Sequence, residues 1–178
     1  MKLQAADCRL QIGTLTILAA LFCVQSGRAE VIDRVLAVVS GSLITLSDVN
    51  AANDLGLVTP GPSDDPIRDV LSQLIDRELQ LAEVDRYAPP EPSAGDVDRE
   101  VQAVRSRFPS LEAFDAVLAR SGIDLAHLRE TMRENLRIRA YLDQRFSVSD
   151  ARRQQVVKDW IVGLRRRADI IDLYRVGR

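Results

Sequence analysis

Cysteine, histidine and aromatic residues are scarce in this chain of 178 residues, and each scarcity excludes a class of function. Two cysteines and one histidine are too few for a zinc site built from several nitrogen and sulfur ligands. Aromatic residues make up only 4% of the chain, so platforms that stack nucleic-acid bases are poorly supplied. The formal net charge of −2 also argues against a general nucleic-acid binder, which would carry a basic surface. We therefore expect neither a metal nor a nucleic-acid partner.

Phosphate-binding glycine motifs are absent as well. The sequence contains neither GxxxxGK[ST] nor GxGxxG. We therefore expect no cofactor and no small-molecule substrate. With 46% hydrophobic and 28% charged residues, the composition is that of an ordinary globular domain.

Residues 1–29 are predicted to be a secretory signal peptide. Its apolar stretch, Leu10–Val24, would be about 22 Å long as a helix, shorter than the hydrocarbon core of about 30 Å that a membrane span must cross. Small residues at Gly27 and Ala29 fit the positions −3 and −1 of a signal peptidase site. Cleavage between Ala29 and Glu30 would place the protein in the periplasm.

Both cysteines, Cys8 and Cys23, belong to the predicted signal peptide. The domain that remains, residues 30–178, therefore contains no thiol for a disulfide, a nucleophile or a metal ligand. Its stability must come from an apolar core, and a domain of this length can bury enough surface for that.

A hairpin and a C-terminal strand are expected to enclose a helical chain. The β-branched residues of 31–39, a turn at 40–42 and a return at 43–45 predict the hairpin, and residues 169–176 predict a further strand. Because a strand needs a partner, we expect the C-terminal strand to pair with the hairpin. The predicted fold is mainly α, with about six helices and a small antiparallel sheet. The expected helix starts are marked by Ser47, Asp65, Ser93, Ser110, Asp124 and Ser149.

Few side chains suggest chemistry. His127, the only histidine, is expected on the surface near a helix start, with no nucleophile or orienting group nominated beside it. Trp160 is expected to be a buried core residue of the last helix. The basic run Arg165–Arg167 is interpreted as an ion-paired helix end, with an anion or lipid-headgroup site as the alternative. None of these features predicts an enzyme.

Five stretches of the chain occur in an order that resembles a known family. They are Val35–Asp48 (VLAVVSGSLITLSD), Leu71–Glu83 (LSQLIDRELQLAE), Phe108–Phe114 (FPSLEAF), Gly122–Arg129 (GIDLAHLR) and Ile138–Asp150 (IRAYLDQRFSVSD). In this order they are similar to the chaperone core of SurA-type periplasmic chaperones. The resemblance extends over essentially all of the chain after the predicted signal peptide.

The resemblance implies a helical domain that is completed by a C-terminal helix and strand. Members of the family normally carry one or two parvulin-type prolyl isomerase domains just after the segment that matches Val148–Asp150. Here that segment continues directly into 151–168 and the closing strand, so the isomerase activity is not expected. The function implied is ATP-independent capture of unfolded polypeptides, typically precursors of outer-membrane β-barrels.

A chaperone core of this kind needs exposed apolar surface to hold a client. Leu55, Leu57 and Val58 are the candidate peptide-binding residues, because local structure alone cannot bury all three. The alternative is that a neighbouring helix covers them. Two other functions stay open: a helical adaptor for one folded envelope protein, and, less favoured, a peptidyl-prolyl isomerase.

The first testable prediction concerns export. The mature protein should begin at Glu30 and be found free in the periplasm, because the apolar stretch is too short to span the membrane. N-terminal sequencing of the exported protein measures this directly. A membrane-bound product that retains Leu10–Val24 would contradict the prediction.

Overall fold

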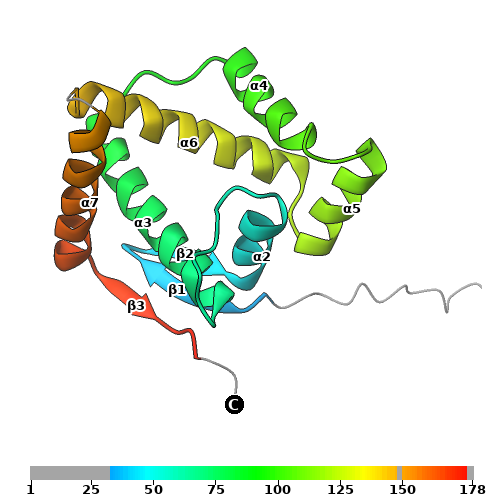
Figure 1. The fold of residues 1–178 in the computed structure, drawn as a ribbon, viewed down its shortest axis with the longest axis horizontal. Coiled ribbons are helices and arrows are strands. Elements are labelled where there is room, and N and C mark those ends of the chain that lie inside the picture. The colour runs from blue at the N-terminus through cyan, green and yellow to red at the C-terminus, as the bar shows by residue number, and fades with distance from the viewer. Residues whose placement is uncertain (1–32, 148–149, 176–178) are drawn as a thin grey trace, which may run out of the picture. The chain divides into compact units, whose positions relative to one another are not determined.

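The computed structural model describes residues 33–147 and 150–175, which form six helices and a three-stranded antiparallel sheet (Figure 1). The predicted fold class is thereby confirmed. The predicted signal peptide, the cleavage site at Ala29–Glu30 and the expected cap Ser149 lie outside these residues. The elements are β1 (Val35–Val39), β2 (Ser42–Thr45), α2 (Leu46–Asp54), α3 (Pro66–Tyr87), α4 (Ala94–Arg105), α5 (Leu111–Ser121), α6 (Leu125–Arg145), α7 (Asp150–Arg167) and β3 (Ile170–Asp172).

The central strand of the sheet is β1, and the strand order is β2-β1-β3. A two-residue turn joins β1 to β2, and both of its residues have positive φ, 50° at Ser40 and 94° at Gly41. Positive φ at both residues is typical of a type I′ turn, whose backbone twist matches the twist of the two flanking strands. On its other side β1 pairs with β3, with Val38 opposite Ile171, which confirms that the C-terminal strand joins the hairpin.

Side-chain caps define the helix starts. Asp65, Ser93, Ser110 and Asp124 each accept a hydrogen bond from the backbone N–H three residues ahead, as predicted. The expected cap Ser47 is wrong, because α2 begins earlier and Thr45 is its N-cap. The end of α5 also agrees with the sequence. The helix stops at Gly122, whose φ of 76° is the left-handed conformation that commonly ends a helix.

The closing strand is shorter than predicted, because the chain leaves the sheet to contact the beginning of α3. After Asp172 the Tyr174 side chain turns inward, and its hydroxyl donates to Asp65 Oδ1 at 3.0 Å. The Arg68 guanidinium stacks 4.6 Å above the Tyr174 ring and donates to the Tyr174 carbonyl at 3.1 Å. Arg68 also forms an ion pair with Asp172. The C-terminal segment is therefore held by the residues that start α3.

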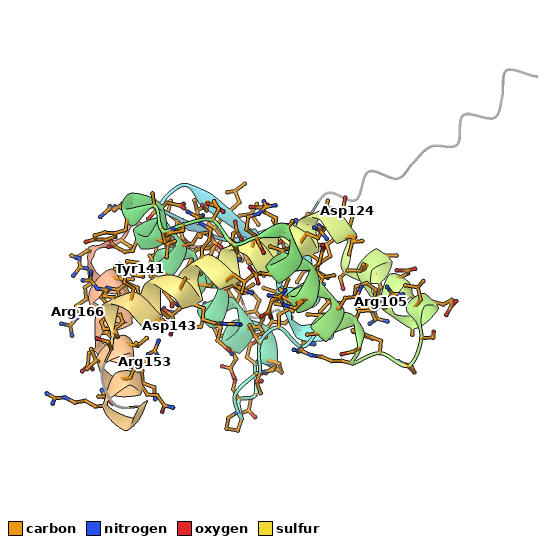
Figure 2. The ribbon with its side chains drawn as sticks, turned by 90° about the horizontal axis from the view of Figure 1, so that it is seen from above. Arg105, Asp124, Tyr141, Asp143, Arg153 and Arg166 are labelled. Atoms are coloured by element: carbon orange, nitrogen blue, oxygen red, sulfur yellow. The ribbon has the colours of Figure 1, made fainter. Side chains whose placement is uncertain are left out.

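Three apolar clusters form the core. The first joins the sheet to α2, α3 and α7, the second joins α2 to α4, α5 and α6, and a small third cluster lies where α3, α6 and α7 meet. Figure 2 shows Tyr141 and Asp143 at the α7 end of α6 and Asp124 at the opposite end. Helix α2 contributes to the first two clusters, so it links the sheet to the outer helices.

Trp160 departs from expectation. It was predicted to be buried, but it is only partly buried and packs against both the first and the third cluster. Its ring centroid lies 6.0 Å from that of Tyr141 and 5.5 Å from that of Phe146. Truncating it should therefore cost less than the roughly 3–5 kcal/mol typical of a fully buried aromatic residue.

The basic end of α7 is partly engaged within the fold. Arg165 forms an ion pair with Asp76 at 2.5 Å and donates to the Ser72 carbonyl at 2.8 Å, whereas Arg166 and Arg167 are exposed. Figure 2 shows Arg153 and Arg166 toward opposite ends of this helix. No helix among residues 33–147 and 150–175 is long and apolar enough to cross a membrane.

The contact between the C-terminus and α3 generates a stability prediction. Tyr174→Phe removes the hydrogen bond to Asp65, and the free energy of unfolding should fall by about 1 kcal/mol. Tyr87→Phe is the matched control, because the Tyr87 side chain is 59% exposed and its loss of a hydroxyl should change stability by less than about 0.5 kcal/mol. Chemical denaturation measures both. Equal stability of the two variants would show that the Tyr174 contact does not hold the C-terminus.

Candidate functional site

A groove of about 280 Å³ lies between β2, α2, α3 and α6. Figure 1 shows these four elements near one another, with α3 and α2 beside the hairpin and α6 crossing α3. Its lining combines apolar and polar side chains. The apolar lining comprises Leu43, Ile44, Ala51, Ala52, Leu57, Val58, Leu74 and Ile123, and the polar lining comprises Asp48, Arg77, Glu78, His127, Thr131, Glu134 and Asn135.

The loop that carries Leu57 and Val58 is held in place by the end of α2. Gly56, with a φ of 63°, donates to Asn53, and Leu57 N–H donates to the Ala52 carbonyl at 2.8 Å. These two bonds are those of a Schellman motif, which reverses the chain after a helix and packs the residue after the glycine against the last turn. Leu57 and Val58 therefore return along α2 toward the groove.

Two side chains, one from α3 and one from the segment after α4, hold the same loop. Arg107 Nη1 donates to the Gly56 carbonyl at 2.7 Å, and Gln73 Nε2 donates to the Thr59 carbonyl at 3.0 Å. The loop is thus tied to α3 on one side and to the segment after α4 on the other. This anchoring fixes the wall of the groove that the loop forms.

The three predicted peptide-binding residues do not share one environment. Leu57 and Val58 are half-buried and line the groove, whereas Leu55 is only 1% exposed. Leu55 packs in the core cluster of α2, α4, α5 and α6, so its assignment to a binding surface is wrong. Burial by neighbouring helices, which was the alternative for all three residues, applies to Leu55 alone. The helices leave Leu57 and Val58 accessible.

Arg77 organises the polar wall. From α3 it donates to Glu78 at 2.8 Å, to Glu134 at 2.5 Å and to Asn135 at 2.8 Å, the last two on α6. It also donates to the Thr131 carbonyl at 3.4 Å. One guanidinium therefore links α3 to α6 and is shared between two carboxylates.

The acidic groups of the groove are close enough to affect one another. Burial raises the pKa of the Glu78 carboxyl, Arg77 opposes that effect, and the charges of Glu134 and Asp48 raise the pKa further. Asp48 Oδ2 accepts from the Thr45 N–H and hydroxyl, both at 2.8 Å. Its Oδ1 lies 3.6 Å from His127 Nε2, beyond ordinary hydrogen-bond length.

The groove lies beside β2, which is an edge strand of the sheet among residues 33–147 and 150–175. In a two-residue hairpin the closing pair, here Val39 and Ser42, exchanges hydrogen bonds, so the next pair, Val38 and Leu43, does not. The N–H and C=O groups of Leu43 therefore point away from β1, toward the open edge of β2. Leu43 is among the residues that line the groove, and it is 59% exposed.

Sequence reasoning found two residues of this groove as binding candidates and missed the rest. Arg77 and Glu78 occur only as parts of a matching stretch, His127 is interpreted as a surface residue without a catalytic role, and the α6 residue Glu134 is not singled out. A usable signal was the charged pair Arg77–Glu78 between the apolar positions Ile75 and Leu79. Nothing in the sequence shows that α6 meets this pair.

Comparison with known proteins provides no assignment: no protein-family model matches the sequence, and no curated protein matches it. Among the described residues, no group of three or more histidine, cysteine, aspartate or glutamate side chains could hold a metal ion. The geometry of the groove therefore has to be interpreted from its own side chains.

The groove combines apolar side chains with a few convergent polar groups, as binding sites commonly do. A nucleophilic mechanism requires a hydroxyl or thiol in hydrogen-bond contact with a base. Within the part of the chain that the structure describes, no hydroxyl is hydrogen-bonded to the His127 ring, whose side chain is 53% exposed. What the groove offers is apolar surface, carboxylate acceptors and a strand edge.

The raised pKa of Glu78 predicts a pH-dependent contribution to stability. A carboxyl whose pKa is raised by folding stabilises the protein fully below its unfolded pKa of about 4.3, and this stabilisation is lost as the pH rises through the folded pKa. In Glu78→Gln the side chain at this position has no carboxyl and does not titrate. The stability advantage of the wild type over this variant should therefore decrease between about pH 4 and pH 7.

Glu112→Gln is a control of opposite sign. A hydrogen bond from its own backbone N–H, assisted by Ser110, lowers the pKa of Glu112 at the start of α5. The wild type should gain stability over this variant as the pH rises from the lowered folded pKa to the ordinary glutamate pKa of about 4.3, which lies below the range in which the effect of Glu78 appears. Denaturation of all three proteins at several pH values measures the slopes. Equal slopes for Glu78→Gln and Glu112→Gln would contradict the prediction for Glu78.

Proposed function

We propose that this chain is a periplasmic, ATP-independent chaperone that holds unfolded polypeptides, with precursors of outer-membrane β-barrels as its clients. The observation that carries the proposal is the apolar groove beside the free edge of β2. An unfolded chain offers what this site can bind, namely apolar side chains and unpaired backbone groups. Transport to the periplasm would follow from the predicted signal peptide, residues 1–29.

Exposed apolar side chains on the sheet support a client-binding role. Ala37 and Val39 are buried, so Val38 between them points to the opposite face of β1. Its partners on both sides, Leu43 and Ile171, are 59% and 49% exposed. These three residues form an apolar row across the outer face of the sheet, beginning at the groove.

The backbone edge supports the same role. An extended peptide can add to an open sheet edge through main-chain hydrogen bonds, which do not depend on its sequence. Leu43 supplies one N–H donor and one C=O acceptor at that edge. This mode of binding suits a protein that must hold many different unfolded chains.

The architecture also agrees with what the resemblance implies. In that family the helical domain is completed by a helix and a strand from the C-terminus. Here α7 packs on α3, and β3 pairs with β1. This agreement supports the proposal, while the groove supplies the surface that a client would contact.

Leu43→Ser tests the role of the groove, because Leu43 is exposed and its truncation should leave the core intact. Loss of its apolar contact with a client should weaken binding by about 1.4 kcal/mol, or about tenfold in Kd. Fluorescence anisotropy with a labelled unfolded outer-membrane protein measures the Kd. Light scattering of the aggregating client measures its protection.

Leu111→Ser is the matched control, because Leu111 is 45% exposed on α5 and does not line the groove. It should protect the client as well as the wild type does. Unchanged binding by Leu43→Ser would remove the groove from the proposal. Capture of one folded envelope protein at fixed stoichiometry, without affinity for unfolded chains, would favour the adaptor. Acceleration of prolyl isomerisation would favour the enzyme.

A further inference from the structure

The charges around the groove are not balanced. Three carboxylates, those of Asp48, Glu78 and Glu134, line the groove together with one permanently charged cation, Arg77. Arg77 is already engaged with both glutamates, with Asn135 and with the Thr131 carbonyl. The groove therefore has a surplus of negative charge and unused carboxylate lone pairs.

In the described part of the chain, the neighbouring arginines of α6 do not neutralise this surplus. The next arginines on α6 pair elsewhere: Arg129 with Asp98, Arg133 with Glu130, and Arg137 with Asp85 and Glu91. The increase in the Glu78 pKa caused by Glu134 and Asp48 has the same origin, because like charges at short range disfavour ionisation. A positive charge entering the groove would relieve this repulsion.

The apolar lining of the groove indicates a second property of the ligand, an apolar part. Leu57, Val58 and Leu74 line the same groove as the carboxylates and provide apolar surface there. A lysine or arginine side chain matches both features, since its aliphatic stem covers apolar surface while its charged end stays with polar groups. At about 280 Å³ the groove lies at the lower limit of small-ligand pockets, so it has room for one or two side chains of a segment whose backbone stays outside.

We propose that the groove binds extended polypeptide segments in which a lysine or arginine lies next to an apolar residue. The backbone of the segment pairs with Leu43 at the edge of β2, the apolar side chain contacts the apolar lining of the groove, and the cation lies beside the carboxylates of Glu78, Glu134 and Asp48, on the lone pairs that Arg77 leaves unused. The inference rests on the proposed chaperone function and specifies which parts of a client are held. It also predicts that acidic segments are rejected, because they would add to the negative charge.

Three labelled peptides of identical length test the proposal, with lysine, glutamine or glutamate next to the same leucine. The lysine peptide should bind about fivefold more tightly than the glutamine peptide, and the glutamate peptide should bind most weakly. Raising the salt from about 0.05 M to about 0.5 M should reduce these differences, because the groove is open to solvent. Fluorescence anisotropy with the full mature protein measures each Kd.

Glu134→Gln keeps an acceptor for Arg77 but removes one negative charge, so it should reduce the preference for lysine to about twofold while leaving the glutamine peptide unaffected. Glu130→Gln is the matched control on the same helix, because Glu130 pairs with Arg133 and does not line the groove. It should retain the full preference. If Glu134→Gln fails to fold, the salt dependence of the wild type decides alone.

The possible failures are distinguishable. Equal binding of the three peptides to the wild type, together with intact protection of unfolded clients, would overturn the proposed charge preference and leave the chaperone function standing. Failure to bind any peptide and to protect any client would overturn both. Preference for lysine that persists unchanged in Glu134→Gln would place the selectivity outside the groove.

Discussion

The structure depends on how the two edges of one short strand are occupied. β1 is paired on one side by β2, which follows it through a two-residue turn, and on the other by β3, which comes from the far end of the chain. The pairing of β1 with β2 costs little chain entropy because the connecting loop is short. The pairing of β1 with β3 costs more, because the loop that it closes comprises nearly the whole domain. Burial of the inward-facing residues Ala37 and Val39 against the helices, together with the fastening of Tyr174 to α3, offsets that cost.

The same arrangement determines where a ligand can bind. Because β3 occupies one edge of β1, the open edge next to α2 and α6 belongs to β2, a strand of four residues. Thr45 at its end is used in the cap of α2, which leaves Leu43 as the residue whose backbone faces outward. So short an edge limits uncontrolled strand addition between copies of the protein, a known liability of open sheets. The proposed binding mode therefore depends on the side-chain groove as well as on the edge.

Arg77 gives the groove its shape and its charge. Buried ion pairs are costly unless their polar atoms are satisfied, and Arg77 meets this condition by donating to partners on both α3 and α6. The sharing of one cation between two glutamates holds the helices together but leaves negative charge uncompensated. Stability and ligand selectivity would thus arise from the same contacts.

The local features of this fold were determined by the sequence alone. The caps at Asp65, Ser93, Ser110 and Asp124 need only a side chain and an N–H three residues ahead, so nearby residues decide them. The apolar periodicity that predicts the helices is likewise a local pattern. The pairing of the C-terminal strand with the N-terminal hairpin could be predicted because the sequence indicates no other strand as a partner. Ser47 failed as a cap because Thr45 offers the same chemistry two residues earlier.

Only the tertiary structure decided the candidate site. Leu55 and Leu57 are two residues apart and equally apolar, yet one is covered by the outer helices and the other lines the groove. Arg77 and Glu134 are far apart in the chain, and their contact depends on how α6 crosses α3. Burial and charge pairing are set by whichever segments pack nearby. A pattern within one segment therefore predicts its structure, but not its neighbours.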